Sequence, residues 1–403
     1  MFSVVIPTHN RLDLLKDAIE TVFRQDHSDW ELVIFDNAST DDICGHVQSL
    51  NDRRVRYERS DEFLPVTASW NRAIDLATGD YVTFLGDDDG LTPGYFDAIS
   101  RIIDEFNSPE ILYSALFQFM HPGVAPWDRG GYVIDLRNAF FFAERQAPFL
   151  LPKEDALRAV QGSLGFHRNF TFNIQAFVFS RIFLDKLYED GPVFRSPFPD
   201  YYLANVAMAK AASIVAVPTP ISIAGVSKAS FGYTLFNGQE EKGADMLNTN
   251  LTQDIYYNDV EKFLLPGPLY NTKYAITMEH VVRYLGVSCP GSVDFNRYRR
   301  IQIIALLTAH KDGKWISTPA GRQLWPRLSP AEKLLATAIS LLLSGGRIFN
   351  LNDRIVLRLL RKLADPTGFP PIVRMCDQGS YSRLPQVFDA IENGTIRRSD
   401  VPN

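Results

Sequence analysis

Residues 81–90 read Tyr-Val-Thr-Phe-Leu-Gly-Asp-Asp-Asp-Gly. The aromatic, β-branched and apolar residues before the glycine predict a buried β-strand. The three consecutive carboxylates that follow repel one another unless water or a cation takes up their charge. Mg²⁺ or Mn²⁺ would suit such oxygen ligands, whereas a solvated acidic turn is the plainer alternative, because Asp-Gly pairs are common in turns.

The sequence before this stretch alternates between strand-like and helix-like segments. Short apolar runs predict strands at residues 3–6, 31–35 and 55–57, and each is followed by a segment with helical periodicity. Such βα alternation within ninety residues indicates a mostly parallel α/β sheet flanked by helices, whose ligands bind beyond the carboxyl ends of the strands. Thr8, Asp36 and residues 87–89 all follow such strand ends. We therefore expect them to converge on one site.

Further strands are expected at residues 111–119, 174–179, 214–217 and 221–224. Asp200 follows Pro199 at the start of a helical segment. The helix dipole stabilises a carboxylate at a helix N-terminus, so this position is also explained without a catalytic role. Lys228 lies in a polar turn after the last expected strand and is either a phosphate contact or an exposed loop lysine.

The pattern changes beyond residue 232, where helical segments replace the strands. We therefore expect a catalytic domain over residues 1–235 and a mainly helical domain over 236–403. The charge is unevenly distributed along the chain, whose overall net charge is −6. Residues 1–296 have a net charge of −15, whereas residues 297–374 have a net charge of +10, from fourteen Lys and Arg and four Asp and Glu. This indicates two units that face different partners.

Several features favour a cytoplasmic protein. Its 403 residues, 46% of them apolar, are enough for two domains with a large core. Three widely spaced cysteines fit neither a disulfide framework nor a metal site. The first residues carry no basic leader and read as a strand, and no apolar run approaches the length of a membrane span.

Four motifs, in order and spacing, resemble those of family 2 glycosyltransferases of the GT-A fold. They are Val-Val-Ile-Pro-Thr-His-Asn-Arg (4–11), Asp-Asn-Ala-Ser-Thr-Asp (36–41), Asn-Arg-Ala with Ala-Thr-Gly-Asp-Tyr (71–73, 77–81), and Phe-Leu-Gly-Asp-Asp-Asp (84–89). The resemblance is strong over residues 1–110, weaker over 170–230, and absent beyond 240.

This resemblance implies an inverting transfer from a nucleoside-diphosphate sugar, with UDP favoured, to a hydroxyl acceptor, with Mg²⁺ or Mn²⁺ on the diphosphate. The acidic turn corresponds to the family's Asp-x-Asp motif, although the usual first aspartate falls on Gly86. The resemblance then places the metal on Asp88 with Asp89 adjoining, and the catalytic base on Asp200. It assigns the nucleotide-sugar to Thr8, Asn10, Arg11, Asp36, Arg72 and Asp87, and Lys228 would add a second positive contact to the phosphate.

Two alternatives remain from the sequence. A sugar nucleotidyltransferase would need a glycine-rich basic loop after the first strand, and residues 7–11 contain no glycine. A catalytically inactive carbohydrate- or nucleotide-binding scaffold on the same fold would not need the acidic triplet and Asp200.

The C-terminal part suggests partners of its own. Basic residues alternate with leucine, isoleucine and valine over 354–363, as in a helix that lies on an anionic membrane and meets a lipid-linked saccharide acceptor. Packing of this helix on the catalytic domain is the alternative, and an oligomer is compatible with either. Nucleic acid is not an expected partner, because the predicted cleft is acidic.

Overall fold

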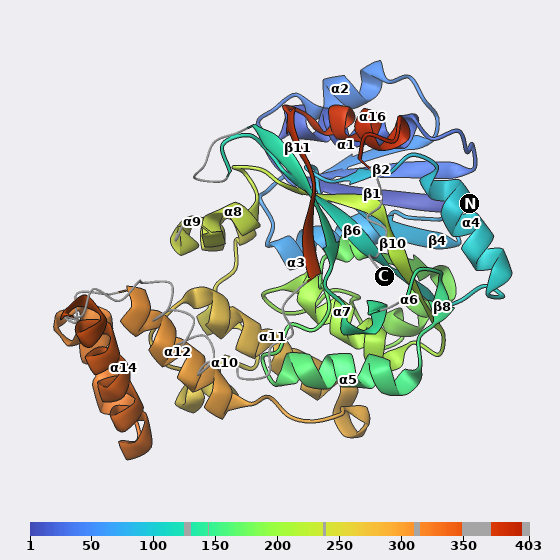
Figure 1. Cartoon of the computed structure of the whole chain (residues 1–403). Coiled ribbons are helices and arrows are strands. Elements are labelled where there is room, and N and C mark those ends of the chain that lie inside the picture. Colours follow the sequence, from blue (N-terminus) through green and yellow to red (C-terminus); the bar gives the residue numbers. More distant parts are fainter. Residues whose placement is uncertain (125–129, 144, 237–238, 310–314, 349–371, 397–403) are drawn as a thin grey trace.

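The computed structural model describes residues 1–124, 130–143, 145–236, 239–309, 315–348 and 372–396 (Figure 1). The strands are β1 (Phe2–Thr8), β2 (Trp30–Asp36), β3 (Val55–Arg59), β4 (Tyr81–Phe84), β5 (Gly90–Leu91), β6 (Ile111–Met120), β7 (Gly131–Arg137), β8 (Phe149–Leu150), β9 (Phe177–Ser180), β10 (Ile214–Val226) and β11 (Ile372–Tyr381). The helices are α1 (Leu12–Phe23), α2 (Ile43–Ser49), α3 (Val66–Asp75), α4 (Tyr95–Glu105), α5 (Lys153–Leu164), α6 (Arg181–Tyr188), α7 (Pro199–Lys210), α8 (Phe231–Phe236), α9 (Glu240–Leu247), α10 (Tyr257–Val260), α11 (Leu269–Leu285), α12 (Phe295–Ala309), α13 (Pro319–Leu324), α14 (Pro330–Ile348) and α16 (Leu384–Glu392).

One sheet organises the molecule, in the order β11-β7-β6-β9-β4-β1-β2-β3, with β10 alongside β6. The predicted parallel part is confirmed, because β1 pairs in parallel with β2 and β4, and β2 with β3. β9 runs antiparallel between β4 and β6. The two strands expected at 214–217 and 221–224 are one strand, β10, whose register shifts between Val217 and Ser222. Pro218 and Pro220 lie in this interval, and proline cannot donate to a β-ladder.

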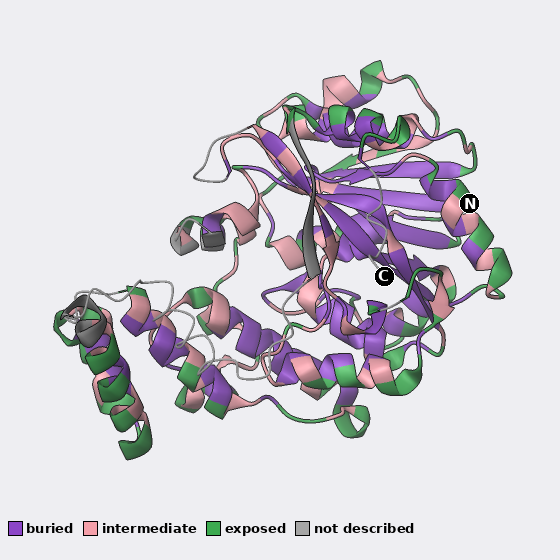
Figure 2. Cartoon of the chain, in the orientation of Figure 1, coloured by how far each residue is buried: buried purple, intermediate pink, exposed green. Residues whose placement is uncertain are grey.

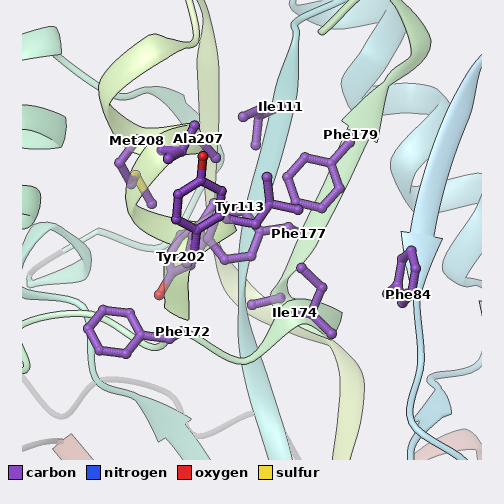
Figure 3. Close-up of a cluster of buried hydrophobic side chains, with 14 of the residues drawn as sticks. Phe84, Ile111, Tyr113, Phe172, Ile174, Phe177, Phe179, Tyr202, Ala207 and Met208 are labelled. Carbon is purple, nitrogen blue, oxygen red and sulfur yellow. The ribbon is translucent and has the colours of Figure 1, made fainter. Parts of the chain in front are cut away.

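Helices cover both faces of the sheet, which explains the continuously apolar strands (Figure 2). Val4 and Ile6 of β1 point to the face covered by α1, α2 and α4, whereas Val5 points to the face covered by α3, α5, α6 and α7. On the second face a dense aromatic cluster forms around β9 (Figure 3). There the rings of Tyr113 and Phe177 lie 4.9 Å apart between centroids. These contacts hold α7 against the sheet.

The C-terminal part is mainly helical, as predicted, but its end returns to the sheet. The core of α11 is continuous with the cluster around β9, whereas α14 packs on α12 at a distance from the sheet (Figure 1). β11 pairs antiparallel with β7, and α16 packs beside α1 (Figure 1), with Arg383 donating to Asp17 and Arg24 pairing with Asp389 at 2.7 Å. Residues 372–396 therefore belong structurally with the sheet, and not with a helical unit spanning all of 236–403. The sequence pattern missed them because the partner strand lies more than 200 residues away.

Among the described helices, none combines the length and the apolar character that a membrane span requires. The basic segment at 354–363 lies outside the described residues, and its predicted helix stays a prediction.

Candidate active site

The acidic turn after β4 is held in shape by Asp89. Its two carboxylate oxygens accept backbone N–H groups from Gly86 at 2.6 Å and Gly225 at 2.8 Å. Burial, followed by the charge of Asp88, raises the pKa of Asp89 well above its usual range. Gly225 is required by close approach, because a Cβ there would lie 1.8 Å from the carbonyl oxygen of Asp88. The turn is thus clamped between β4 and the end of β10.

Asp87 connects this turn to the end of β1. Its carboxylate accepts a hydrogen bond from the Thr8 hydroxyl at 2.8 Å and forms an ion pair with Arg11 at 2.9 Å. Burial raises the pKa of Asp87, and the adjacent guanidinium opposes that rise. The expectation that the tips of β1 and β4 meet is therefore correct in geometry, since adjacent parallel strands end at the same edge.

Asp88 lies between Asp87 and the turn after β10. Its Oδ2 accepts hydrogen bonds from the hydroxyls of Ser227, at 2.9 Å, and Ser230. Its Oδ1 has no hydrogen-bond donor in the part of the chain that the structure describes. Sequence reasoning singled out Lys228 in this turn and missed the two serines on either side of it. Their only signal was a run of small polar residues directly after a strand.

Two adjoining cavities meet at Asp88. The larger, of about 1060 Å³, is lined by Asp88, Asp89 and Asp200, together with Trp70 of α3. The smaller, of about 230 Å³, is lined by Thr8, Arg11, Asp87 and Asp88 and also reaches Trp70. Asp200 therefore shares one cavity with the acidic turn, although 112 residues separate it from Asp88 in the sequence. The indole of Trp70, which carries no distinctive sequence signal, forms part of the wall of both.

Asp200 lies in the first turn of α7, directly after Pro199. Burial raises the pKa of its carboxyl from 3.8 to about 7, and hydrogen bonds from backbone N–H groups oppose that rise only in part. No ion pair to Asp200 occurs among the described residues. A helix N-terminus by itself would favour the charged form, so burial is the dominant effect here. A carboxyl that titrates near neutral pH exchanges a proton readily under physiological conditions.

Four other predicted site residues lie outside both cavities. Asp36 is fully buried and accepts hydrogen bonds from the Tyr57 hydroxyl at 2.8 Å and from Arg59 at 3.2 Å. Asn10, in the left-handed region at φ 54°, accepts from Thr40 and so ties the loop after β1 to the loop after β2. Arg72 is exposed on α3, and Lys228 is exposed with its side chain against Gly123.

The donor set of the acidic turn fits a divalent cation that is shared with a substrate. Three carboxylates face one guanidinium, that of Arg11, and Oδ1 of Asp88 has its lone pairs available. The described residues contain no group of three or more His, Cys, Asp or Glu able to enclose a metal ion. Mg²⁺ is typically bound by one or two carboxylates together with substrate phosphates and water, and a single carboxylate with an available oxygen, as in Asp88, fits that mode of binding.

Comparison with known proteins finds relatives for the first part of the chain. Residues 3–147 match the model described as glycosyl transferase family 2. Escherichia coli (strain K12) WcaA, a glycosyl transferase named for colanic acid biosynthesis, is 42% identical over 95 residues, which are 23% of this chain and 34% of that protein. The GalNAc(5)-diNAcBac-PP-undecaprenol beta-1,3-glucosyltransferase of Campylobacter jejuni is 37% identical over 108 residues, 26% of this chain and 34% of that protein.

These alignments span about a third of the length of both relatives. Among solved structures, S. aureus TarS 1–349 in complex with UDP-GlcNAc matches with a TM-score of 0.45 and 13% identity, over 77% of this chain and 88% of that one. The predicted α/β architecture, with a mostly parallel sheet flanked by helices and followed by a mainly helical part, is confirmed. The family match lies over the same strands and acidic turn that carry the four motifs, and over residues 3–147 the chain is similar to glycosyl transferase family 2.

Proposed function

We propose that this chain is an inverting glycosyltransferase that uses a nucleoside-diphosphate sugar, with UDP favoured. The acceptor would be a hydroxyl group of a saccharide or a lipid-linked saccharide in polysaccharide or glycoconjugate biosynthesis. The observation that carries the proposal is the cavity that contains both Asp88 and Asp200. A metal-binding acid and a proton-accepting acid are what sugar transfer to a hydroxyl group requires, and here one cavity holds a candidate for each.

Asp200 is the proposed general base. In an inverting transfer, the acceptor oxygen forms a bond to the anomeric carbon while the bond to the diphosphate breaks, and the nucleoside diphosphate leaves with the electron pair. The acceptor proton passes to the carboxylate of Asp200. Its pKa of about 7 suits this task, because general-base catalysis is most efficient when the pKa lies near the working pH.

The smaller cavity is the proposed nucleotide site. Thr8 and Asp87 form its polar wall, and Arg11 supplies a positive charge for the nucleotide phosphates. We assign a divalent cation to Asp88 and the bracing of the turn to Asp89. When bound, Mg²⁺ or Mn²⁺ would offset the negative charge that develops on the departing diphosphate. Asp36 and Asn10 would act by holding the loops around this site.

Release of nucleoside diphosphate from a UDP-sugar, measured with and without Mn²⁺, tests the proposal. We expect metal-dependent turnover that falls by about 10²-fold or more in Asp88→Ala, because an electrostatic contact to the leaving group is lost. Asp104→Ala is the matched control, since Asp104 is an exposed acid on α4. Turnover that is unchanged in Asp88→Ala would contradict the assignment.

A cytoplasmic setting with peripheral membrane contact is a further part of the proposal. On α14, the side chains of Leu334, Leu341 and Leu342 are exposed, with Leu334 at 73% and Leu341 at 68%. Exposed leucines next to a strongly basic stretch of sequence resemble a helix that binds an anionic lipid surface.

A further inference from the structure

The part of the larger cavity's wall that comes from α5 and the segment after it carries cationic side chains. Arg158 comes from α5, and Arg168 follows in the segment between α5 and β9. The acids among the described lining residues are Asp88, Asp89 and Asp200. The cavity therefore combines acids at the sheet edge and at the start of α7 with guanidinium groups on its remaining wall.

Arg168 packs on the ring of Tyr270, which in turn contacts the residue next to the proposed base. Its guanidinium carbon lies 4.8 Å from the centroid of the Tyr270 ring. The Tyr270 hydroxyl lies 3.1 Å from that of Tyr201, the residue after Asp200. Burial raises the pKa of Tyr201, and the charge of Arg168 opposes that rise, so the guanidinium acts electrostatically on the wall next to Asp200.

Within the described residues, no carboxylate lies within ion-pair distance of Arg168. Arg158 has a partner, Asp155, but at 3.9 Å and on an exposed surface, where such pairs contribute little. A guanidinium that lines a cavity and stacks on a ring keeps its donors available to a ligand. Carboxylate and phosphate groups match the geometry of these donors best.

Resting on the function proposed above, we propose that this wall is the acceptor subsite and that the acceptor is an anionic saccharide, which bears a phosphate or carboxylate group that Arg168 binds. Arg158 contributes further positive charge to the same wall. An acceptor bound to Arg168 would lie beside α7, and the acceptor hydroxyl would then be close to the carboxylate of Asp200. An uncharged sugar would leave the guanidinium without a partner in the complex and would therefore bind more weakly.

Calorimetric titration of the full chain, saturated with UDP and Mn²⁺ to occupy the nucleotide site, tests this inference. The probes are glucose 1-phosphate, glucuronate and uncharged methyl glucoside. We expect one of the anionic probes to bind about tenfold or more tightly than methyl glucoside, as one charge-assisted hydrogen bond would give. Whichever of the two is preferred identifies phosphate or carboxylate as the recognised group.

Three variants separate binding from folding. Arg168→Gln should remove the preference for the anionic probe, and Arg168→Lys should restore part of it. Arg145→Gln is the matched control, because Arg145 also stacks on a ring, that of Phe149, but lines neither cavity. Equal affinities for charged and uncharged probes, or equal losses in Arg168→Gln and Arg145→Gln, would overturn the inference. Failure of the proposed function would appear separately, as absent sugar-nucleotide turnover in the wild type.

Discussion

The substitution Asp200→Asn should make the protein more stable than the wild type at alkaline pH, and it also removes the proposed base. The folded-state pKa of this carboxyl is about 7, whereas its unperturbed value is 3.8. Between these values the folded state holds a proton that the unfolded state has released. The free energy of unfolding of the wild type therefore falls as pH rises from about 4 to 7, and the loss is complete above 7.

The magnitude follows from the size of the pKa difference. A shift of about three units at roughly 1.4 kcal/mol per unit corresponds to about 4 kcal/mol as an upper limit. Asn has the same shape, retains an oxygen that accepts backbone N–H groups, and carries no charge. We therefore expect Asp200→Asn to be more stable than the wild type by up to about 4 kcal/mol at pH 8, but by only about 1 kcal/mol at pH 4.5.

Urea unfolding followed by tryptophan fluorescence at the two pH values measures this difference, and Asp104→Asn is the exposed control. The same variant should lose about 10²- to 10⁴-fold in transfer activity, the usual contribution of a general base. Wild-type activity should fall as pH drops below about 7, because the base must be ionised. The reasoning is refuted if Asp200→Asn and the wild type show the same pH dependence of stability, or if the variant transfers sugar at the wild-type rate.

Two other changes test the site and the C-terminal part. Gly225→Ala should destabilise the chain by about 1–3 kcal/mol and disturb the acidic turn, since its Cβ would collide with the Asp88 carbonyl. Chemical denaturation checks this, and a stability equal to that of Gly291→Ala, where the added Cβ would lie at an ordinary 3.8 Å from Leu164, would contradict the argument. Leu334→Asp with Leu341→Asp should reduce flotation with anionic vesicles without affecting sugar-nucleotide turnover, because both side chains are exposed on α14. Flotation that does not differ between anionic and neutral vesicles, or between the double variant and the wild type, would remove the membrane proposal.

The sequence alone was sufficient to predict which residues meet at the carboxyl ends of neighbouring strands. Alternating βα segments imply parallel strands, and parallel strands bring their carboxyl ends to one edge, so the meeting of Thr8 with Asp87 followed from pattern alone. The family motifs are equally local, because three of them are a strand end with the loop after it and one is the end of α3 with the loop before β4.

The sequence was less informative where a residue's role depends on distant neighbours. Asp36 also lies at the end of a strand, yet it lines neither cavity: its Oδ2 accepts hydrogen bonds from Tyr57 and Arg59, and its Oδ1 accepts from the backbone N–H of Ser39. Arg72 belongs to a motif, but helical geometry places it on the exposed side of α3. The return of β11 to β7 depends on pairing across more than 200 residues, which no local periodicity encodes.

What the sequence by itself determined is the alternation of strands and helices over the first ninety residues, the acidic turn, and the edge of the sheet at which that turn lies. These follow from short-range preferences and from side-chain alternation, which act over a few residues. Only the tertiary structure decided that Asp200 and Asp88 line one cavity, that the pKa of Asp200 rises to about 7, and that Arg168 lines the same cavity. The reason is that burial and charge proximity are properties of the packed chain, since segments far apart in sequence create the low-dielectric environment in which one carboxyl holds its proton.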